Sequence, residues 1–144
     1  MAKSSRPRTA RASTARERRT PRLPHQLKVA LAAARSKKAT AITVLDLKKT
    51  GAFTDHFLMC TGGNARQVHA IADAIEQALK EKKVRPSHVE GYGRAEWVLL
   101  DYFDFIVHVF SPAARQFYGL ERLWGEAVRI DLPDDDPDDL PSGA

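Results

Sequence analysis

The sequence predicts an α/β domain built on a small mixed sheet of about five strands with three main helices. Residues 56–61 are apolar at nearly every position, which is typical of a central strand covered on both faces. An apolar stripe at helical spacing follows it. Residues 96–101 and 104–110 are strand patterns separated by two residues, a gap that fits only an antiparallel hairpin. A crossover helix and a hairpin in one sheet make that sheet mixed.

The first predicted helix covers residues 25–38, where apolar side chains recur at helical spacing and Pro24 suits the first turn. Residues 41–46 then alternate as expected of a strand, and a turn over residues 48–51 follows.

The second predicted helix begins after Gly62 and Gly63. Asn64 is its predicted N-cap, and Gln67 is expected to reach back to Asn64. Its apolar stripe consists of Val68, Ile71, Ala72, Ile75 and Leu79. Pro86 ends the helix and a short strand over residues 88–90 follows, which we interpret as a right-handed βαβ unit with a parallel sheet core.

The third predicted helix starts at Ser111 and Pro112, a cap followed by a proline, and ends near Gly125. Val128 and Ile130 indicate a short extended piece after it. Since three helices are few for two faces of five strands, we expect one face to be only partly covered. The helix face expected to point to the core comprises Ala113, Phe117, Leu120 and Trp124.

Charge divides the 144 residues into a domain and two tails. Residues 1–23 are predicted to be a disordered basic tail, residues 24–131 the folded domain, and residues 132–144 a disordered acidic tail. The basic tail either contacts RNA phosphates nonspecifically or only adds solubility, and its composition does not choose between them. Its apolar residues are too few for the amphipathic helix of a mitochondrial presequence.

Cys60 is the only cysteine, so the chain forms no internal disulfide and fits a reducing compartment. No apolar stretch approaches the roughly 20 residues that span a bilayer, and the N-terminus lacks the apolar run of a secretory signal. These features predict a cytoplasmic protein with no membrane partner. In its apolar strand, Cys60 is expected to be a buried small hydrophobe and not a nucleophile.

Catalytic patterns are weak. Gly62-Gly63-Asn64 precedes a helix N-terminus, a natural anion site, but lacks the further residues of a phosphate loop. A nucleotidyltransferase needs two or three clustered carboxylates for magnesium, whereas Asp101 and Asp104 flank a hairpin without a third. The five histidines show no ligand spacing. We therefore expect no enzyme activity, no metal site and no cofactor.

The segment of residues 90–104 is acidic in an otherwise basic chain, with one arginine against Glu90, Glu96, Asp101 and Asp104. Acidic surfaces steer partners of opposite charge.

Trp97, Leu99 and Asp101 share one face of the strand in this segment, and Val98 and Leu100 share the other. If the second pair points to the core, Trp97 is displayed beside carboxylates, as in many protein interfaces. The alternative places Trp97 in the core of a sheet covered on both sides, and the pattern alone leaves both open.

Over residues 25–131 the chain resembles the ribosomal silencing factors, also called the Iojap family. The matching residues are Thr54–Phe57, Cys60-Thr61-Gly62, Val-His-Ala-Ile-Ala-Asp at 68–73, Glu90-Gly91, Trp97, Asp101-Tyr102, Asp-Phe-Ile-Val-His-Val-Phe at 104–110, Arg115, Phe117-Tyr118, Leu120-Glu121 and Leu123-Trp124.

This resemblance implies a fold similar to the nucleotidyltransferase fold without its catalytic site. It also implies binding to ribosomal protein fourteen of the large ribosomal subunit, which sterically blocks the small subunit and represses translation under nutrient limitation. Family members can self-associate, so a homodimer is an open alternative. The alternative functions are a metal-dependent nucleotidyltransferase and an RNA-binding module acting through the basic tail. The partner-binding residues implied are Trp97 as anchor, with Leu99, Asp101, Tyr102, Asp104 and Glu90 around it.

Phe103 stands where the family hairpin usually has glycine. Because phenylalanine disfavours positive φ, a different turn geometry is expected there. Asn64 replaces the usual serine or threonine and is expected to cap equally well.

Overall fold

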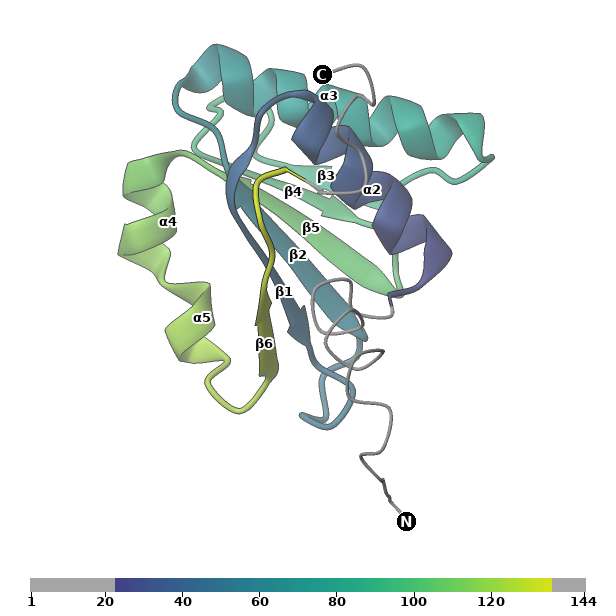
Figure 1. The fold of residues 1–144 in the computed structure, drawn as a ribbon, viewed down its shortest axis with the longest axis vertical. Coiled ribbons are helices and arrows are strands. Elements are labelled where there is room, and N and C mark those ends of the chain that lie inside the picture. The colour runs from purple at the N-terminus through teal and green to yellow at the C-terminus, as the bar shows by residue number, and fades with distance from the viewer. Residues whose placement is uncertain (1–22, 136–144) are drawn as a thin grey trace.

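The computed structural model describes residues 23–135, which form one six-stranded mixed sheet with helices on both faces (Figure 1). The predicted tails lie largely outside these residues. In chain order the elements are α2 (His25–Ser36), β1 (Thr40–Asp46), β2 (His56–Thr61), α3 (Ala65–Glu81), β3 (His88–Glu90), β4 (Trp97–Asp101), β5 (Phe105–Phe110), α4 (Pro112–Tyr118), α5 (Leu120–Leu123) and β6 (Val128–Asp131).

The strand order is β3-β4-β5-β2-β1-β6. Only β2 and β5 pair in parallel, and every other neighbouring pair is antiparallel. The parallel core expected from the β2–α3–β3 unit is therefore reduced to the single pair β2 and β5. The chain crosses over through α3 to β3 at the sheet edge, so β4 and β5 lie between β3 and β2. Burial explains this order: β2 and β5 are buried at all six positions and fill the centre, whereas β3 is exposed at all three and lies at an edge.

The extended piece expected near Val128 and Ile130 is a sixth strand, β6, which pairs antiparallel with β1 at the other edge. Ile130 lies opposite Val44 in this ladder. The expectation of about five strands was one short, because a four-residue edge strand with three exposed positions carries little pattern of its own.

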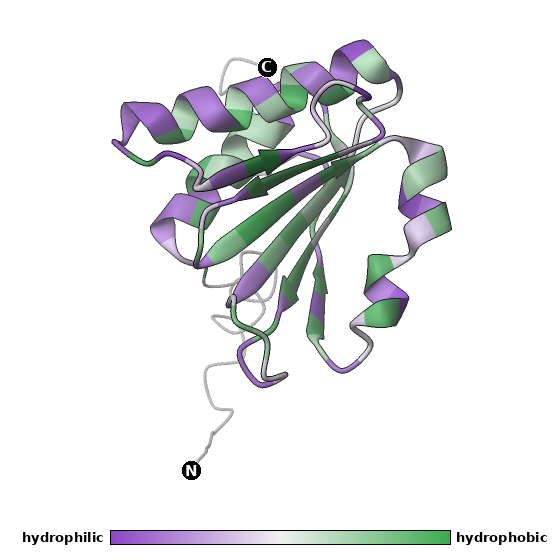
Figure 2. Ribbon diagram, turned by 180° about the vertical axis from the view of Figure 1, so that it is seen from behind, coloured by the Kyte–Doolittle hydropathy of each residue, from purple (hydrophilic) through white to green (hydrophobic). Residues whose placement is uncertain are grey.

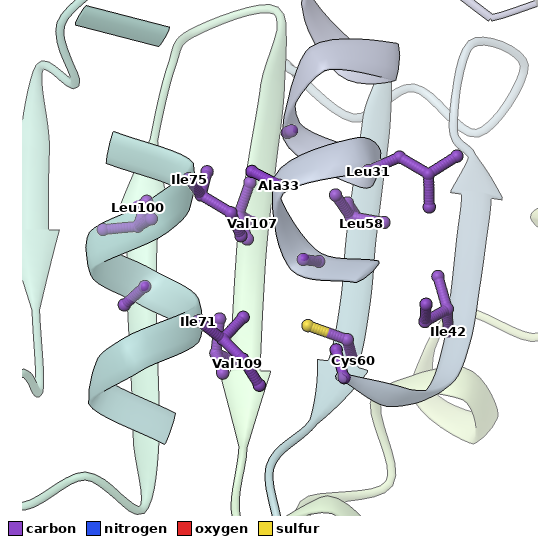
Figure 3. Packing of buried hydrophobic residues seen from close by; sticks show 14 of the residues in the cluster. Leu31, Ala33, Ile42, Leu58, Cys60, Ile71, Ile75, Leu100, Val107 and Val109 are labelled. Atoms are coloured by element: carbon purple, nitrogen blue, oxygen red, sulfur yellow. The ribbon is translucent and has the colours of Figure 1, made fainter. Parts of the chain in front are cut away.

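The main core lies between the sheet and the helices α2 and α3. The predicted stripe of α3 supplies all of its buried residues, and Figure 3 shows Ile71 and Ile75 beside Val107 and Val109 of β5. Cys60 is fully buried in this core, as expected. Figure 2 shows the opposite pattern on the outside of α3, where hydrophilic residues face away from the sheet.

Asn64 caps α3, since its side-chain oxygen accepts the Gln67 backbone N–H at 2.8 Å. Gln67 reaches back one residue further than expected, because its side-chain oxygen accepts the Gly63 N–H and not that of Asn64. Its amide nitrogen also donates to the carbonyls of Lys37 and Lys38 just after α2. This side chain therefore links the start of α3 to the end of α2.

The expectation of one continuous last helix is wrong, because Gly119 takes a left-handed conformation (φ 54°) and divides it into α4 and α5. The break rotates the two halves relative to each other. Leu120 is buried and Trp124 is half-buried, as expected. Ala113 is exposed and Phe117 is 77% exposed, so neither faces the core.

The β4–β5 turn keeps the conformation that a glycine would adopt, so the expected change of turn geometry is wrong. Phe103 has φ 75° and its side chain is 73% exposed. Its N–H donates to the Asp101 carboxylate at 2.8 Å, and its carbonyl accepts the Thr54 hydroxyl at 2.8 Å. Bonds on both sides of Phe103 hold the strained residue in place.

We expect Phe103→Gly to raise the free energy of unfolding by about 1 kcal/mol, because it relieves a left-handed non-glycine residue and gives up an exposed ring. Urea denaturation measures the change. Phe103→Ala is the matched control, since it removes the ring but keeps the strain. Equal stability of the glycine and alanine variants would show that the turn stores no backbone strain.

Candidate docking site

Strand β4 places the side chains of Trp97, Leu99 and Asp101 on the face of the sheet that points away from α2 and α3. Val98 and Leu100, the alternate positions, are fully buried in the main core beneath those helices. Trp97 and Leu99 instead border a second, smaller core made with α4 and α5. Of the two alternatives left open by the sequence, the structure has the face of Trp97 turned away from the main core.

Trp97 itself is half-buried. Its ring lies 4.6 Å from that of Tyr118 in α4 and 5.2 Å from that of Phe110 in β5, measured between centroids. Its indole N–H donates to Nδ1 of His108 at 3.0 Å. The indole is thus held on its inner side while part of the ring remains open to solvent.

Acidic side chains extend this face toward the sheet edge. Glu90 lies directly opposite Leu99 in the β3–β4 ladder and is exposed, with His88 as its polar neighbour. Asp101 is half-buried and accepts the N–H of Phe103, and Asp104 is exposed beyond the turn. Leu99 therefore adjoins the exposed carboxylate of Glu90, whereas the neighbours of Trp97 are the rings of Phe110 and Tyr118. We call the side chains of Glu90, Trp97, Leu99, Asp101 and Asp104 the docking face.

Tyr102, implied as a contact residue, is not part of the docking face. Its side chain is 7% exposed, stacks on Phe105 at 5.1 Å and belongs to the main core. Tyr102 continues the alternation of Val98 and Leu100, and this parity was readable in the sequence. Burial raises the pKa of Tyr102, with Glu76 adding to the effect, and its hydroxyl has no hydrogen-bond partner in the described part of the chain.

His108 is the residue that the sequence analysis missed. It lies opposite Leu99 in the β4–β5 ladder and is 3% exposed, with its ring 4.5 Å from that of Phe57 in an edge-to-face contact. Burial and, to a smaller extent, the charge of the nearby Arg115 lower the pKa of His108 to about 3. The ring is therefore neutral at physiological pH. The register of the predicted hairpin could have placed His108 beside Leu99 on the same sheet face. It could not have shown the hydrogen bond between His108 and the indole nitrogen of Trp97.

Below about pH 6.5, the free energy of unfolding should fall. His108 stays neutral in the folded chain but binds a proton with a pKa of 6.5 when unfolded, so its contribution is lost as pH drops from 6.5 toward 3. The loss between about pH 7.5 and about pH 5 should be about 2 kcal/mol. Urea denaturation at both values measures it.

His108→Asn should remove most of this pH dependence and leave a small remainder from His56, whose pKa burial also lowers. An unchanged pH dependence in His108→Asn would contradict the assignment.

A polar cluster around Arg115 fixes α4 and α5 to the sheet. Its guanidinium bonds the Glu121 carboxylate through two nitrogens, at 2.8 and 2.7 Å. It also donates to the Ala41 carbonyl and to the hydroxyls of Thr61 and Thr43, on β1 and β2. Burial, the largest single effect, would raise the pKa of Glu121, but the hydrogen bond from Arg115, a backbone hydrogen bond and the charges of Arg115 and Arg129 together lower it. The cluster thereby holds Tyr118 of α4 against Trp97.

Residues 23–135 contain neither a cluster of metal-binding side chains nor a membrane-spanning helix. No group of three His, Cys, Asp or Glu side chains could hold a metal ion, and no helix is long and apolar enough to cross a membrane.

Comparison with known proteins identifies the family. Residues 20–143 match the family described as "Ribosomal silencing factor during starvation". The ribosomal silencing factor RsfS of Bacillus subtilis is 42% identical over 106 residues, covering 74% of this chain and 90% of that protein. A crystal structure of a Chromobacterium violaceum protein superposes with a TM-score of 0.67 at 38% identity, covering 69% of this chain and 83% of the other.

A more distant relative is the mouse protein named "Mitochondrial assembly of ribosomal large subunit protein 1". It is 28% identical over 93 residues, covering 62% of this chain and 41% of that protein. From the family match and the bacterial relatives together, the chain belongs to the ribosomal silencing factor family.

Proposed function

We propose that this protein docks on the large ribosomal subunit through the docking face and sterically prevents the small subunit from joining. Translation then falls, as the words "during starvation" in the family description suggest for nutrient limitation. The observation that carries the proposal is Trp97, a half-buried aromatic residue on the sheet face turned away from α2 and α3. The mouse relative's name, which refers to the large subunit, supports this choice of subunit.

The partner in this proposal is ribosomal protein fourteen of the large subunit. An aromatic anchor contributes much of the energy of a protein interface, and charges at its rim steer a partner of opposite sign. Glu90, Asp101 and Asp104 give this face a negative rim, which suits a basic ribosomal protein. Obstruction requires no bond to be made or broken, so the mechanism needs no catalytic residue and no cofactor. The site of action would be the cytoplasm.

Co-sedimentation with isolated large subunits tests the proposal. Trp97→Ala should weaken association about 30-fold, since truncating an aromatic anchor typically costs about 2 kcal/mol or more. In a second measurement, light scattering should show that the native protein slows subunit joining and that the variant does not. Joining at an unchanged rate with saturating native protein would refute the proposed function.

Charge reversal provides a matched pair. Asp104→Lys on the docking face should slow association, and the difference should shrink as salt is raised. Glu81→Lys, at the exposed end of α3, changes the net charge equally but lies away from the docking face. Equal effects of the two variants would mean that overall charge, and not this face, governs association.

A further inference from the structure

We propose that His108 is a positioning residue: it binds the Trp97 indole N–H inside the protein, so that the partner meets only the apolar ring. This rests on the proposed function in so far as Trp97 is the docking anchor. The partner must therefore present to Trp97 a side chain that complements an apolar ring.

The direction of this hydrogen bond fixes the state of His108. An indole nitrogen only donates, so Nδ1 of His108, 3.0 Å away, must be the acceptor and carries no proton. A neutral imidazole then bears its proton on Nε2. Nε2 is buried and has no hydrogen-bond partner among the described residues, and Phe57 packs edge-to-face on the ring. His108 therefore has one polar contact in this region, the indole of Trp97.

The orientation of Trp97 follows from this contact. The hydrogen bond holds the indole nitrogen toward the sheet, and Phe110 and Tyr118 pack against the ring. The N–H donor is consumed, so the exposed part of Trp97 is hydrocarbon. An aliphatic side chain, or a cation lying over the ring face, complements such a surface, whereas a lone hydrogen-bond acceptor does not.

The apolar surface continues from Trp97 onto α4. Tyr118 is 47% exposed and contacts the Trp97 ring, and Phe117 packs edge-to-face on Tyr118 at 5.0 Å. The three rings together form a larger exposed aromatic surface than Trp97 alone. The kind of partner that fits is a basic protein surface bearing an aliphatic or arginine side chain at its centre, opposite Trp97.

His108→Asn and His108→Leu form the test pair, because asparagine and leucine have nearly the same shape and leave similar space. The asparagine Oδ1 attaches to Cγ as Nδ1 does in histidine, so only His108→Asn can accept the indole N–H. The first readout is hydrogen exchange of the Trp97 indole proton by NMR in the full chain, assigned with Trp97→Phe. The second is co-sedimentation with large subunits.

We expect slow indole exchange in the native protein and in His108→Asn, and at least about tenfold faster exchange in His108→Leu. Large-subunit association should weaken about tenfold in His108→Leu and recover in His108→Asn. Trp97→Phe, which has a ring but no N–H, should retain more association than Trp97→Ala.

Rapid indole exchange in the native protein would overturn the positioning role without any variant, even if His108→Leu failed to fold. Equal association of the leucine and asparagine variants, in an assay where Trp97→Ala does weaken association, would also overturn it. Failure of the proposed function looks different: indole protection would follow the pattern above, while no variant, Trp97→Ala included, would change large-subunit association.

Discussion

Replacing Arg115 with methionine should lower the free energy of unfolding by about 3–5 kcal/mol, the range for removing one partner of a buried ion pair. Both side chains of the Arg115–Glu121 pair are largely shielded from water, at 12% and 15% exposure. The substitution strands the Glu121 carboxylate and leaves the Ala41 carbonyl without its guanidinium donor. Urea denaturation measures the loss.

The same substitution should change how stability responds to pH. In the native protein the Glu121 pKa is lowered, so its contribution is present above the unfolded pKa and lost as pH falls toward the folded pKa. Without Arg115, burial dominates and raises the pKa of Glu121 in the folded variant. The folded variant then binds a proton more readily than the unfolded chain, so acidification through the unfolded pKa of Glu121 should stabilise the variant relative to the native chain.

The double variant Arg115→Met with Glu121→Leu is the control. Removing both charges should recover part of the stability, because no unpaired carboxylate remains. Arg115→Met within about 1 kcal/mol of the native protein would mean that the cluster is not structural. Since Arg115 holds α4 against β1 and β2, the variant should also free Tyr118 from Trp97 and weaken large-subunit docking.

Local patterns predicted the elements of the main core well. The stripe of α3 and the alternation of Val98 and Leu100 depend only on periodicity, and burial on one side follows from it. The break at Gly119 could not be predicted in this way, because glycine is tolerated within helices and the left-handed turn depends on how α5 meets the sheet. Strand order also depends on which strands compete for the centre, which no local pattern contains.

Periodicity along the strand predicted which residues share the docking face. The contacts of that face with other elements were missed, because no local pattern contains them. Trp97, Leu99 and Asp101 share a face by parity alone, while Tyr102 has the opposite parity and was included only through the family resemblance. The bond between Trp97 and His108 joins two strands across the hairpin, so it depends on register and on side-chain rotamers together. The contact of Tyr118 with Trp97 depends further on where α4 leaves the sheet.

Gly91→Ala should destabilise the β3–β4 connection by about 2–4 kcal/mol, or detach β3 outright. Gly91 has φ 77°, and a Cβ placed there would lie 2.1 Å from the carbonyl oxygen of Trp97. That oxygen belongs to the backbone, so no flexible side chain can move aside. Relief requires the start of β4 to shift, and with it the backbone of Trp97.

Gly93→Ala is the matched control two residues away, where an added Cβ meets nothing within 4 Å and φ is not positive. It should leave stability within about 0.5 kcal/mol of the native value. Amide hydrogen exchange of Leu99 and Leu100, which pair with β3, distinguishes local detachment from global unfolding. If Gly91→Ala proved as harmless as Gly93→Ala, the chain would have another low-energy path from β3 into β4. Trp97 would then be held by His108 and Tyr118 and not by the course of its own strand.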